Sequence, residues 1–278
     1  MKFVRFLDGS RIAYGVADGD LIEEISSTPF LPHETTGISH PLSGTRLLAP
    51  CLPSKVIGVG LNYRDHADEM GMPIPEEPMF FFKPSTSVVG PASKIVWPRG
   101  CERLDYEGEL AVVIGAVAKG VSRDRWQEVV LGYTCAIDAT ARDQQEKDSQ
   151  WGRAKGFDTA GPLGPWIETD IVPDDLALIT KVNGEVKQEA RTSSLIFNVG
   201  ELIEFITTSI TLLPGDVIMT GTPKGAGPLK DGDRVAVEIE GIGSLEVGVQ
   251  GLAPAAPDEE GRPPAPVGIG PSPAEGAE

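Results

Sequence analysis

Residues 104–114 read Leu-Asp-Tyr-Glu-Gly-Glu-Leu-Ala-Val-Val-Ile and give the clearest chemical signal in the chain. The second half, Leu110–Ile114, is aliphatic throughout and predicts a buried strand. If that strand already begins at Glu107, the alternation of side chains puts Glu107 and Glu109 on one face. Two carboxylates this close repel each other unless a cation lies between them. The stretch therefore predicts either a metal site or a solvated, acidic strand start.

Asp138 is a third acidic residue in a comparable position. It directly follows the apolar run Tyr133–Ile137 and is expected to emerge where that strand ends. Three carboxylates without a nearby His or Cys describe an all-oxygen site for a hard ion, Mg²⁺ or Mn²⁺, because zinc prefers nitrogen or sulfur ligands. Mg²⁺ is the first choice. The residues alone leave open the alternative that the three acids are unrelated.

Elsewhere the chain is rich in strand and turn signals. It holds 33 Gly and 24 Pro, which favour short elements and many turns over a helical bundle. A hairpin is expected at Asp8-Gly9, with a type I′ turn, and a second turn at Asn183-Gly184. We therefore expect a β-rich α+β protein, a roll or sandwich with peripheral helices. The expected strands are 2–7, 11–16, 56–59, 78–82, 110–114, 133–137, 178–182, 217–220, 234–239 and 243–247.

Two peripheral helices are predicted. Ser122 can cap a helix that ends at Gly132. Asn198 and Glu201 resemble a capping box, and the apolar residues that follow supply a buried stripe.

The charge balance excludes one class of partner. There are 24 Lys and Arg against 41 Asp and Glu, a net charge of −17, whereas nucleic-acid binding depends on clustered cations. The longest apolar run, Leu110–Ala118, is far shorter than the ~20 residues that span a bilayer. We expect a cytoplasmic protein that binds neither nucleic acid nor membrane. The Pro-, Gly- and acid-rich segment 251–278 is predicted to be a disordered tail.

A second candidate group lies around His66. If Asp65 or a neighbour caps a short helix, His66 and Glu69 face the same way. A carboxylate beside an imidazole orients the ring and supports its charged form, which allows the His to act as a general base towards water. Gly71 and the Pro-rich residues 72–78 predict a loop able to close over a site. The alternative is an exposed surface pair.

Positively charged residues and a turn form a third group. Lys83, Arg142 and Lys155 stand out in a chain short of positive charge. The Gly-rich turn Thr220–Gly225 can direct backbone N–H groups and a Thr hydroxyl at a carboxylate, although it lacks the spacing of a P-loop. Taken alone, each of these features is better explained by a structural role.

Taken together and in order, these blocks closely resemble the fumarylacetoacetate hydrolase family. The similarity runs from about residue 56 to 247, roughly two thirds of the chain, and points to the branch with acylpyruvate hydrolases, oxaloacetate decarboxylases and hydroxyheptadienedioate isomerases. The blocks are Gly60–Tyr63 with His66 and Glu69, Phe82–Ser85, Tyr106–Leu110, Asp138 with Ala141–Asp143, Lys155–Asp158, Gly161–Trp166, Val182–Gly184 and Leu213–Gly225.

This resemblance implies a fold, an assembly and a set of site residues. The fold implied is a mixed β-sandwich roll of the family's C-terminal-domain type over residues 51–250, after a small β unit at 1–50, in a homodimer. The site residues implied are Glu107, Glu109 and Asp138 for Mg²⁺ or Mn²⁺, His66, Glu69 and Lys155 for catalysis, and Arg142, Gln145 and Thr222 for substrate binding.

The implied substrate is a small 2-oxo acid, which can chelate a cation through a carboxylate oxygen and the keto oxygen. Three carboxylates around a dication leave the site net negative, so Lys155 is expected to help hold an anionic substrate. The expected activity is Mg²⁺-dependent hydrolysis of the C–C bond of acylpyruvate-like 1,3-dioxo acids, with a pyruvate enolate as intermediate. The alternatives are decarboxylation of oxaloacetate-type acids, isomerisation of 2-hydroxyhepta-2,4-diene-1,7-dioate, and a non-catalytic metabolite-binding protein on the same scaffold.

Overall fold

The computed structural model describes residues 1–251, which form three sheets. The longest contains β1 (Lys2–Asp8), β2 (Arg11–Asp18), β3 (Leu21–Ile25), β4 (Thr35–Pro41), β5 (Arg46–Leu47), β6 (Lys55–Gly60), β7 (Met79–Pro84), β8 (Val88–Val89), β11 (Gly108–Ile114), β12 (Val130–Ile137), β14 (Gly161–Glu168) and β17 (Val217–Met219). The second contains β9 (Lys94–Val96), β15 (Ala177–Val182), β16 (Glu185–Arg191), β19 (Arg234–Ile239) and β20 (Gly243–Gln250). The third contains β10 (Leu104–Tyr106), β13 (Thr140–Ala141) and β18 (Gly227–Pro228).

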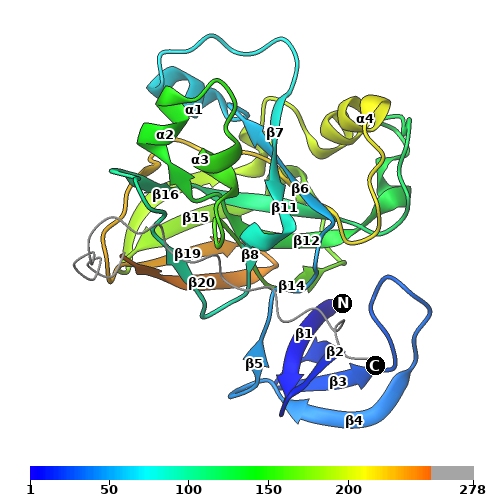
Figure 1. The fold of residues 1–278 in the computed structure, drawn as a ribbon. Coiled ribbons are helices and arrows are strands. Elements are labelled where there is room, and N and C mark those ends of the chain that lie inside the picture. The colour runs from blue at the N-terminus through cyan, green and yellow to red at the C-terminus, as the bar shows by residue number, and fades with distance from the viewer. Residues whose placement is uncertain (252–278) are drawn as a thin grey trace, which may run out of the picture.

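The long sheet runs in the order β4-β3-β2-β1-β14-β12-β11-β17-β6-β7, with β5 beside β1 and β8 beside β14. Most pairs are antiparallel, but β17 lies parallel to β6, so the sheet is mixed. The second sheet, ordered β16-β15-β19-β20-β9, packs against its central part (Figure 1). These layers confirm the predicted β-rich α+β class and the mixed β-sandwich arrangement.

The helices lie at the periphery of the sheets. They are α1 (Arg64–Glu69), α2 (Arg142–Lys147), α3 (Gly152–Gly156) and α4 (Val199–Ser209). Short 3₁₀ turns occur at Ser85–Ser87, Trp126–Val129, Pro173–Asp175 and Thr192–Ser194. In Figure 1, α1, α2 and α3 gather over one end of the molecule, whereas α4 lies apart from them. No helix within residues 1–251 is both long enough and apolar enough to cross a membrane.

Strand β11 is buried on both faces, which explains its unbroken apolar sequence. Leu110, Val112 and Ile114 belong to the core shared with β15, β19 and β20 of the second sheet. The alternate residues Ala111 and Val113 face the opposite core, together with side chains of β14 and β17. The strand begins at Gly108, so Glu107, which was considered as its first residue, lies directly before it.

Both predicted turns are present, with one correction. Asn183 and Gly184 have φ values of 53° and 83°, as a type I′ turn requires. The first hairpin pairs Asp8 with Arg11, so its two-residue loop is Gly9-Ser10. Within that loop the positive φ is at Gly9, and this pattern fits type II′ instead of the expected I′.

One predicted helix is confirmed and the other is wrong. Asn198 and Glu201 form the expected capping box of α4. Between Ser122 and Gly132 the structure has only the 3₁₀ turn Trp126–Val129, and β12 begins directly after it. Tertiary pairing decides this, because Val130 lies opposite Ile114 in the long sheet and β-branched residues suit a strand.

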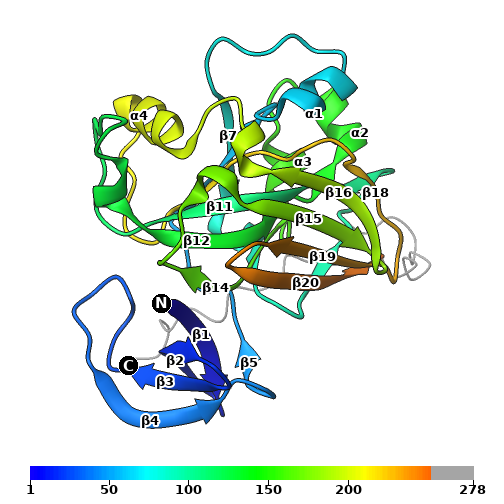
Figure 2. The ribbon, with the colours of Figure 1, turned by 180° about the vertical axis from the view of Figure 1, so that it is seen from behind.

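The N-terminal strands extend the long sheet instead of forming a separate one. Strand β1 pairs with β14, with Lys2 opposite Glu168 and Phe3 opposite Ile167. Phe3 also belongs to the core cluster that contains Ile167. In Figures 1 and 2, β1–β5 lie beneath the rest of the molecule. The domain division near residue 50 stays a prediction, and the predicted tail lies outside the described residues beyond 251.

Candidate active site

The three predicted ligand acids converge at one end of β11 and β12. Glu107 lies between β10 and β11, Glu109 lies on β11, and Asp138 follows β12. The pairing of Gly108 with Ile137 brings the two strand ends together, and the Asp138 N–H donates to the Glu107 carbonyl at 2.8 Å. Each acid offers a carboxylate oxygen within 4.8 Å of the others, and all three side chains are buried.

Two buried lysines contact these acids. The Lys155 ammonium donates to Glu107 Oε2 at 2.8 Å, to Asp138 Oδ2 at 2.7 Å and to Thr140 Oγ1 at 2.7 Å. The Lys83 ammonium lies 2.7 Å from Asp138 Oδ1 and donates to two backbone carbonyls, those of Lys155 and Ala160. Both lysines are almost completely buried, with exposed fractions of 0% for Lys83 and 2% for Lys155.

The second lysine corrects the charge balance expected from the sequence. With Lys155 alone, three carboxylates leave a strongly negative site, but Lys83 also pairs with Asp138 and Arg142 pairs with Glu107. Burial lowers the pKa of Lys83, whereas for Lys155 the charges of Asp138 and Glu107 outweigh burial and raise the pKa. A dication added to this cluster makes it net positive, which suits an anionic ligand.

The carboxylates differ sharply from one another in their environment. Burial raises the pKa of Glu109 well above its ordinary value, and the charges of Asp138 and Glu107 raise it further. Burial also acts on Glu107, but Lys155 and Arg142 outweigh it and hold that pKa below its ordinary value. Glu109 is therefore the least compensated negative charge in the cluster.

The residues present fit a divalent metal. Glu109 accepts a hydrogen bond from the Gly221 N–H at 2.7 Å and has no cationic side chain bonded to it in the described structure. Its buried carboxylate lies within 4.8 Å of those of Glu107 and Asp138, an arrangement that added positive charge would stabilise. An all-carboxylate donor set without His or Cys suits Mg²⁺, Mn²⁺ or Ca²⁺ better than zinc.

His66 and Glu69 form the predicted pair on α1. His66 Nδ1 lies 3.2 Å from Glu69 Oε2, and Glu69 also accepts a hydrogen bond from the Gly225 N–H at 3.1 Å. The short helix is present, with the neighbouring Tyr63 at the N-cap without a side-chain cap and Asp65 in the first turn. The contact with Gly225 ties α1 to the turn after β17.

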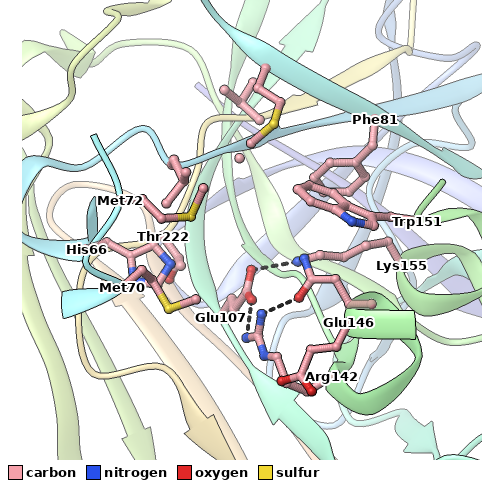
Figure 3. A pocket seen from close by; sticks show the side chains of 15 residues that line it. His66, Met70, Met72, Phe81, Glu107, Arg142, Glu146, Trp151, Lys155 and Thr222 are labelled. Carbon is pink, nitrogen blue, oxygen red and sulfur yellow. Dashed lines mark hydrogen bonds and ion pairs between the residues drawn. The ribbon is translucent and has the colours of Figure 1, made fainter. Parts of the chain in front are cut away.

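A cavity of about 260 Å³ joins the two groups (Figure 3). Of the nine predicted site residues, six line it: His66, Glu107, Arg142, Gln145, Lys155 and Thr222. Glu109 and Asp138 are buried beside Glu107, and Glu69 contacts the lining residue His66 on α1. In Figure 3, Lys155 and Arg142 approach Glu107 from one side, while His66 and Thr222 lie on the other.

The three residues assigned to substrate binding form hydrogen bonds with other groups of the protein. The Arg142 guanidinium donates to Glu107 Oε1 at 2.6 Å, to Asp105 Oδ2 at 2.9 Å and to Gln145 Oε1 at 2.5 Å. The Thr222 hydroxyl donates to the Gly108 carbonyl at 2.9 Å. In this arrangement Arg142 positions Glu107.

Sequence reasoning left three structurally important residues out of the predicted site. Lys83 is the last residue but one of the aromatic strand β7 and is buried between the exposed Phe82 and Pro84, so the alternation along that strand could have indicated it. Asp105 is buried between Arg103 and Arg142. Its position in the same acidic stretch as Glu107 and Glu109 could have indicated it. Gln188 accepts from the Gly108 N–H and donates to Thr222, but its strand is mostly exposed and gave no signal.

The geometry agrees with the comparisons with known proteins. Residues 55–250 match the fumarylacetoacetate (FAA) hydrolase C-terminal family, and residues 1–50 match a family described as Rv2993c-like, N-terminal. The chain belongs to the fumarylacetoacetate hydrolase family. Rv2993c of Mycobacterium tuberculosis is 48% identical over 255 residues, which cover 88% of this chain and 96% of that protein. Members of the family are enzymes, hydrolases or isomerases, and commonly bind a divalent metal.

Solved structures of this family superpose closely on the chain. A 5-carboxymethyl-2-hydroxymuconate delta-isomerase from Mycobacterium smegmatis is 47% identical, with a TM-score of 0.85 over 91% of this chain and 100% of the other. A 2-hydroxyhepta-2,4-diene-1,7-dioate isomerase from Mycobacterium marinum is 46% identical, with a TM-score of 0.84 over 90% and 98%. Maleylpyruvate hydrolase from Sphingobium is 30% identical, with a TM-score of 0.76 over 91% and 100%.

Proposed function

We propose that this protein is an Mg²⁺-dependent hydrolase that cleaves the C–C bond of acylpyruvate-like 2,4-dioxo acids. One observation carries the proposal. His66, with Glu69 on its Nδ1, lines the same cavity as Glu107 and Lys155. A candidate general base therefore faces a candidate metal site across a space that holds one small molecule.

Glu107, Glu109 and Asp138 are the residues that would hold the ion. When bound there, Mg²⁺ supplies Lewis-acid stabilisation of negative charge on a keto oxygen. Lys155 and Lys83 contribute the positive charge that favours an anionic substrate over water. Arg142 and Thr140 hold the Glu107 carboxylate in place through hydrogen bonds of 2.6 and 3.1 Å.

His66 acts as the general base in the hydrolytic step. Its Nδ1 is engaged by Glu69, so Nε2 is the nitrogen available to take a proton from water. The water oxygen forms a bond to the C4 carbonyl carbon, and the C3–C4 bond breaks. The electron pair of that bond goes to the pyruvate fragment as its enolate, and the proton held by His66 returns to C3. The products are pyruvate and a carboxylic acid.

Isomerisation is the second candidate, because the two solved structures at 46% and 47% identity are named isomerases. Moving a double bond in a hydroxydienoate also requires a proton carrier near an enolate-stabilising site, and His66 can fill that role. Decarboxylation of an oxaloacetate-type acid needs the same enolate stabilisation without water attack. The complete acid cluster and the His66–Glu69 pair argue against a non-catalytic binding protein.

A substrate panel with the Mg²⁺-loaded protein separates these reactions. The panel holds acetylpyruvate, fumarylpyruvate, oxaloacetate and a hydroxymuconate-type diacid, assayed in ¹⁸O-labelled water. Hydrolysis releases pyruvate and places one ¹⁸O atom in the carboxylic acid product. Release of CO₂ identifies a decarboxylase, and an ultraviolet shift without pyruvate release identifies an isomerase. A protein inert towards all four compounds contradicts the proposal.

A further inference from the structure

Five of the larger apolar side chains that line the cavity have no part in the proposed chemistry. We name them the apolar collar: Met70, Met72, Met79, Phe81 and Trp151. In Figure 3, Phe81 and Trp151 lie on the Lys155 side, while Met70 and Met72 lie on the His66 side. Apolar groups therefore flank the cavity from two sides, and the flexible methionines can adapt to different shapes.

The strand beneath the collar leaves space for its rings. The Phe81 and Trp151 ring centroids lie 5.6 Å apart at an interplanar angle of 66°. A Cβ on Gly58 of β6 would lie 2.3 Å from the Phe81 ring, and a Cβ on Gly60 would lie 3.0 Å from the Met79 methyl. Glycine at these two positions of β6 permits the rings and the thioether to pack where they do.

The collar begins next to the charged end of the cavity. The Lys155 ammonium, which binds Glu107 and Asp138, lies 5.1 Å from the centroid of the Phe81 ring. A 2-oxo acid head held at the acid cluster therefore extends its next carbon atoms towards apolar side chains. The group attached to the C4 carbonyl is the part of the substrate that meets the collar.

The charged residues that line the cavity do not favour a second carboxylate there. Arg142 already donates to Asp105, Glu107 and Gln145, and Lys155 donates to three acceptors at the acid cluster. Glu146 also lines the cavity and repels an anion. Placing a carboxylate against apolar groups without a partner is costly.

We propose, on the basis of the proposed function, that the substrate carries an uncharged, apolar alkyl or aryl group on its C4 carbonyl. The collar selects this group over a second carboxylate. The substrate class is therefore the apolar acylpyruvates and not the dicarboxylic dioxo acids. The carbon skeleton stays small, because the cavity measures about 260 Å³.

A matched pair of substrates tests the selection. The acids 2,4-dioxoheptanoate and 2,4-dioxoheptanedioate have the same length and differ only in a terminal methyl or carboxylate. We expect kcat/KM of the Mg²⁺-loaded protein to be at least about tenfold higher for the monoacid, the lower end of what one apolar contact achieves. Equal values, or a preference for the diacid, overturn the inference.

A binding measurement separates this inference from the proposed reaction. Calorimetric titration with 2-oxoheptanoate and 2-oxoheptanedioate, which have no second keto group to cleave, reports the preference without turnover. Tighter binding of the monoacid together with no cleavage of either dioxo acid supports the inference and contradicts the proposed hydrolysis. Failure to bind either 2-oxo acid overturns both proposals.

Variants test whether the collar determines which substrate is preferred. Met72→Lys adds a cation at a half-exposed collar position, so the chain keeps its fold. We expect the ratio of kcat/KM for diacid over monoacid to rise at least about tenfold. Ile74→Lys, on the same loop and 45% exposed but outside the cavity lining, is the matched control and leaves the ratio unchanged. An unchanged ratio in Met72→Lys overturns the assignment.

Discussion

At Glu109, a buried carboxylate accepts a hydrogen bond from the Gly221 N–H and faces the carboxylates of Glu107 and Asp138. Its raised pKa means that the charged form is disfavoured in the folded protein relative to the unfolded chain. Above its ordinary pKa, Glu109 ionises more readily in the unfolded chain than in the fold, so this residue destabilises the metal-free protein. The same charge is what a divalent ion requires.

The variant Glu109→Gln separates these two effects. Without metal, we expect its Tm to rise by a few degrees, since ~1 kcal/mol shifts Tm by roughly 2–4 °C at this size. The amide can still accept the Gly221 hydrogen bond. Scanning calorimetry with and without Mg²⁺ measures both effects, and the Mg²⁺-dependent rise in Tm should disappear. A variant with undiminished Mg²⁺ stabilisation contradicts the metal assignment.

His66 can be tested against metal binding. We expect His66→Ala to lower kcat for hydrolysis by about 10²–10⁴, the usual contribution of a general base. Its Mg²⁺ affinity, measured by titration calorimetry, should remain close to that of the native chain because His66 contacts Glu69 and none of the three acids. Loss of Mg²⁺ affinity in proportion to kcat means that the role of His66 is misassigned.

Residue types and spacing indicated the acidic groups and the His66–Glu69 pair as candidates, whereas the roles of Lys155, Arg142, Gln145 and Thr222 came from the family resemblance. The pairs Glu107–Glu109 and His66–Glu69 are local in sequence, so periodicity alone indicates that each shares a face. Lys83 comes from a strand that is distant in the chain, and its ion pair with Asp138 exists only in the folded sheet. Long-range ion pairs of this kind leave no local pattern.

At the scale of elements, local signals predicted structure wherever they agreed with tertiary pairing. The capping box of α4 and the Asn183-Gly184 turn are determined by their own residues, and both are present. The helix expected before Gly132 is absent because the last residues of that segment form the start of β12 and pair with β11. Propensity is a weak guide when a strand partner is available.

The α4 cap permits a quantitative prediction. Asn198→Ala removes the side-chain acceptor for the Glu201 N–H, and we expect a loss of about 1 kcal/mol in the free energy of unfolding. Asn198→Asp keeps an acceptor at the N-cap and is the control. Urea unfolding of both variants measures the difference, and equal stabilities show that the cap contributes nothing.

The N-terminal strands β2, β3 and β4 are linked through Glu24. Arg11 donates to both Glu24 oxygens, at 2.9 and 2.7 Å, and His40 Nε2 lies 3.0 Å away. Hydrogen bonds from Arg11 lower the pKa of Glu24 to about 2, below its ordinary value of 4.5. The stability that this shift contributes is present above pH 4.5 and is lost as the pH falls towards 2.

We therefore expect Glu24→Gln to lower Tm at pH 7 and to differ less from the native chain as the pH falls from about 5 to 3. The neighbouring, exposed Glu23→Gln is the control and should follow the native chain at every pH. Thermal unfolding between pH 3 and 7 measures the gap. A gap that stays constant across this range shows that the Glu24 contacts do not titrate.

At the scale of the whole molecule, the N-terminal strands and the sheet that carries the site share hydrogen bonds and a core. Phe3 on β1 packs in the same cluster as Leu163 and Ile167 of β14. The sequence indicated a small N-terminal β unit but not its attachment to β14, because that pairing joins residues more than 160 positions apart.

This attachment predicts cooperative unfolding. Phe3→Ala creates a cavity in a shared core, and we expect a loss of about 3–5 kcal/mol with a single thermal transition. Differential scanning calorimetry checks the number of transitions as well as Tm. Two separate transitions, only one of which responds to the substitution, show that residues 1–50 unfold independently.

The position of β17 in the long sheet has a consequence during synthesis. Strand β11 pairs with β12 soon after both are made, but its other neighbour, β17, lies about a hundred residues further on, with Met219 opposite Ala111. At ~5–20 residues per second, the ribosome needs roughly 5–20 s to supply it. Until then one edge of β11, next to the acid cluster, is open to pairing with other chains. We expect chaperones that shield nascent chains to protect this edge during that interval.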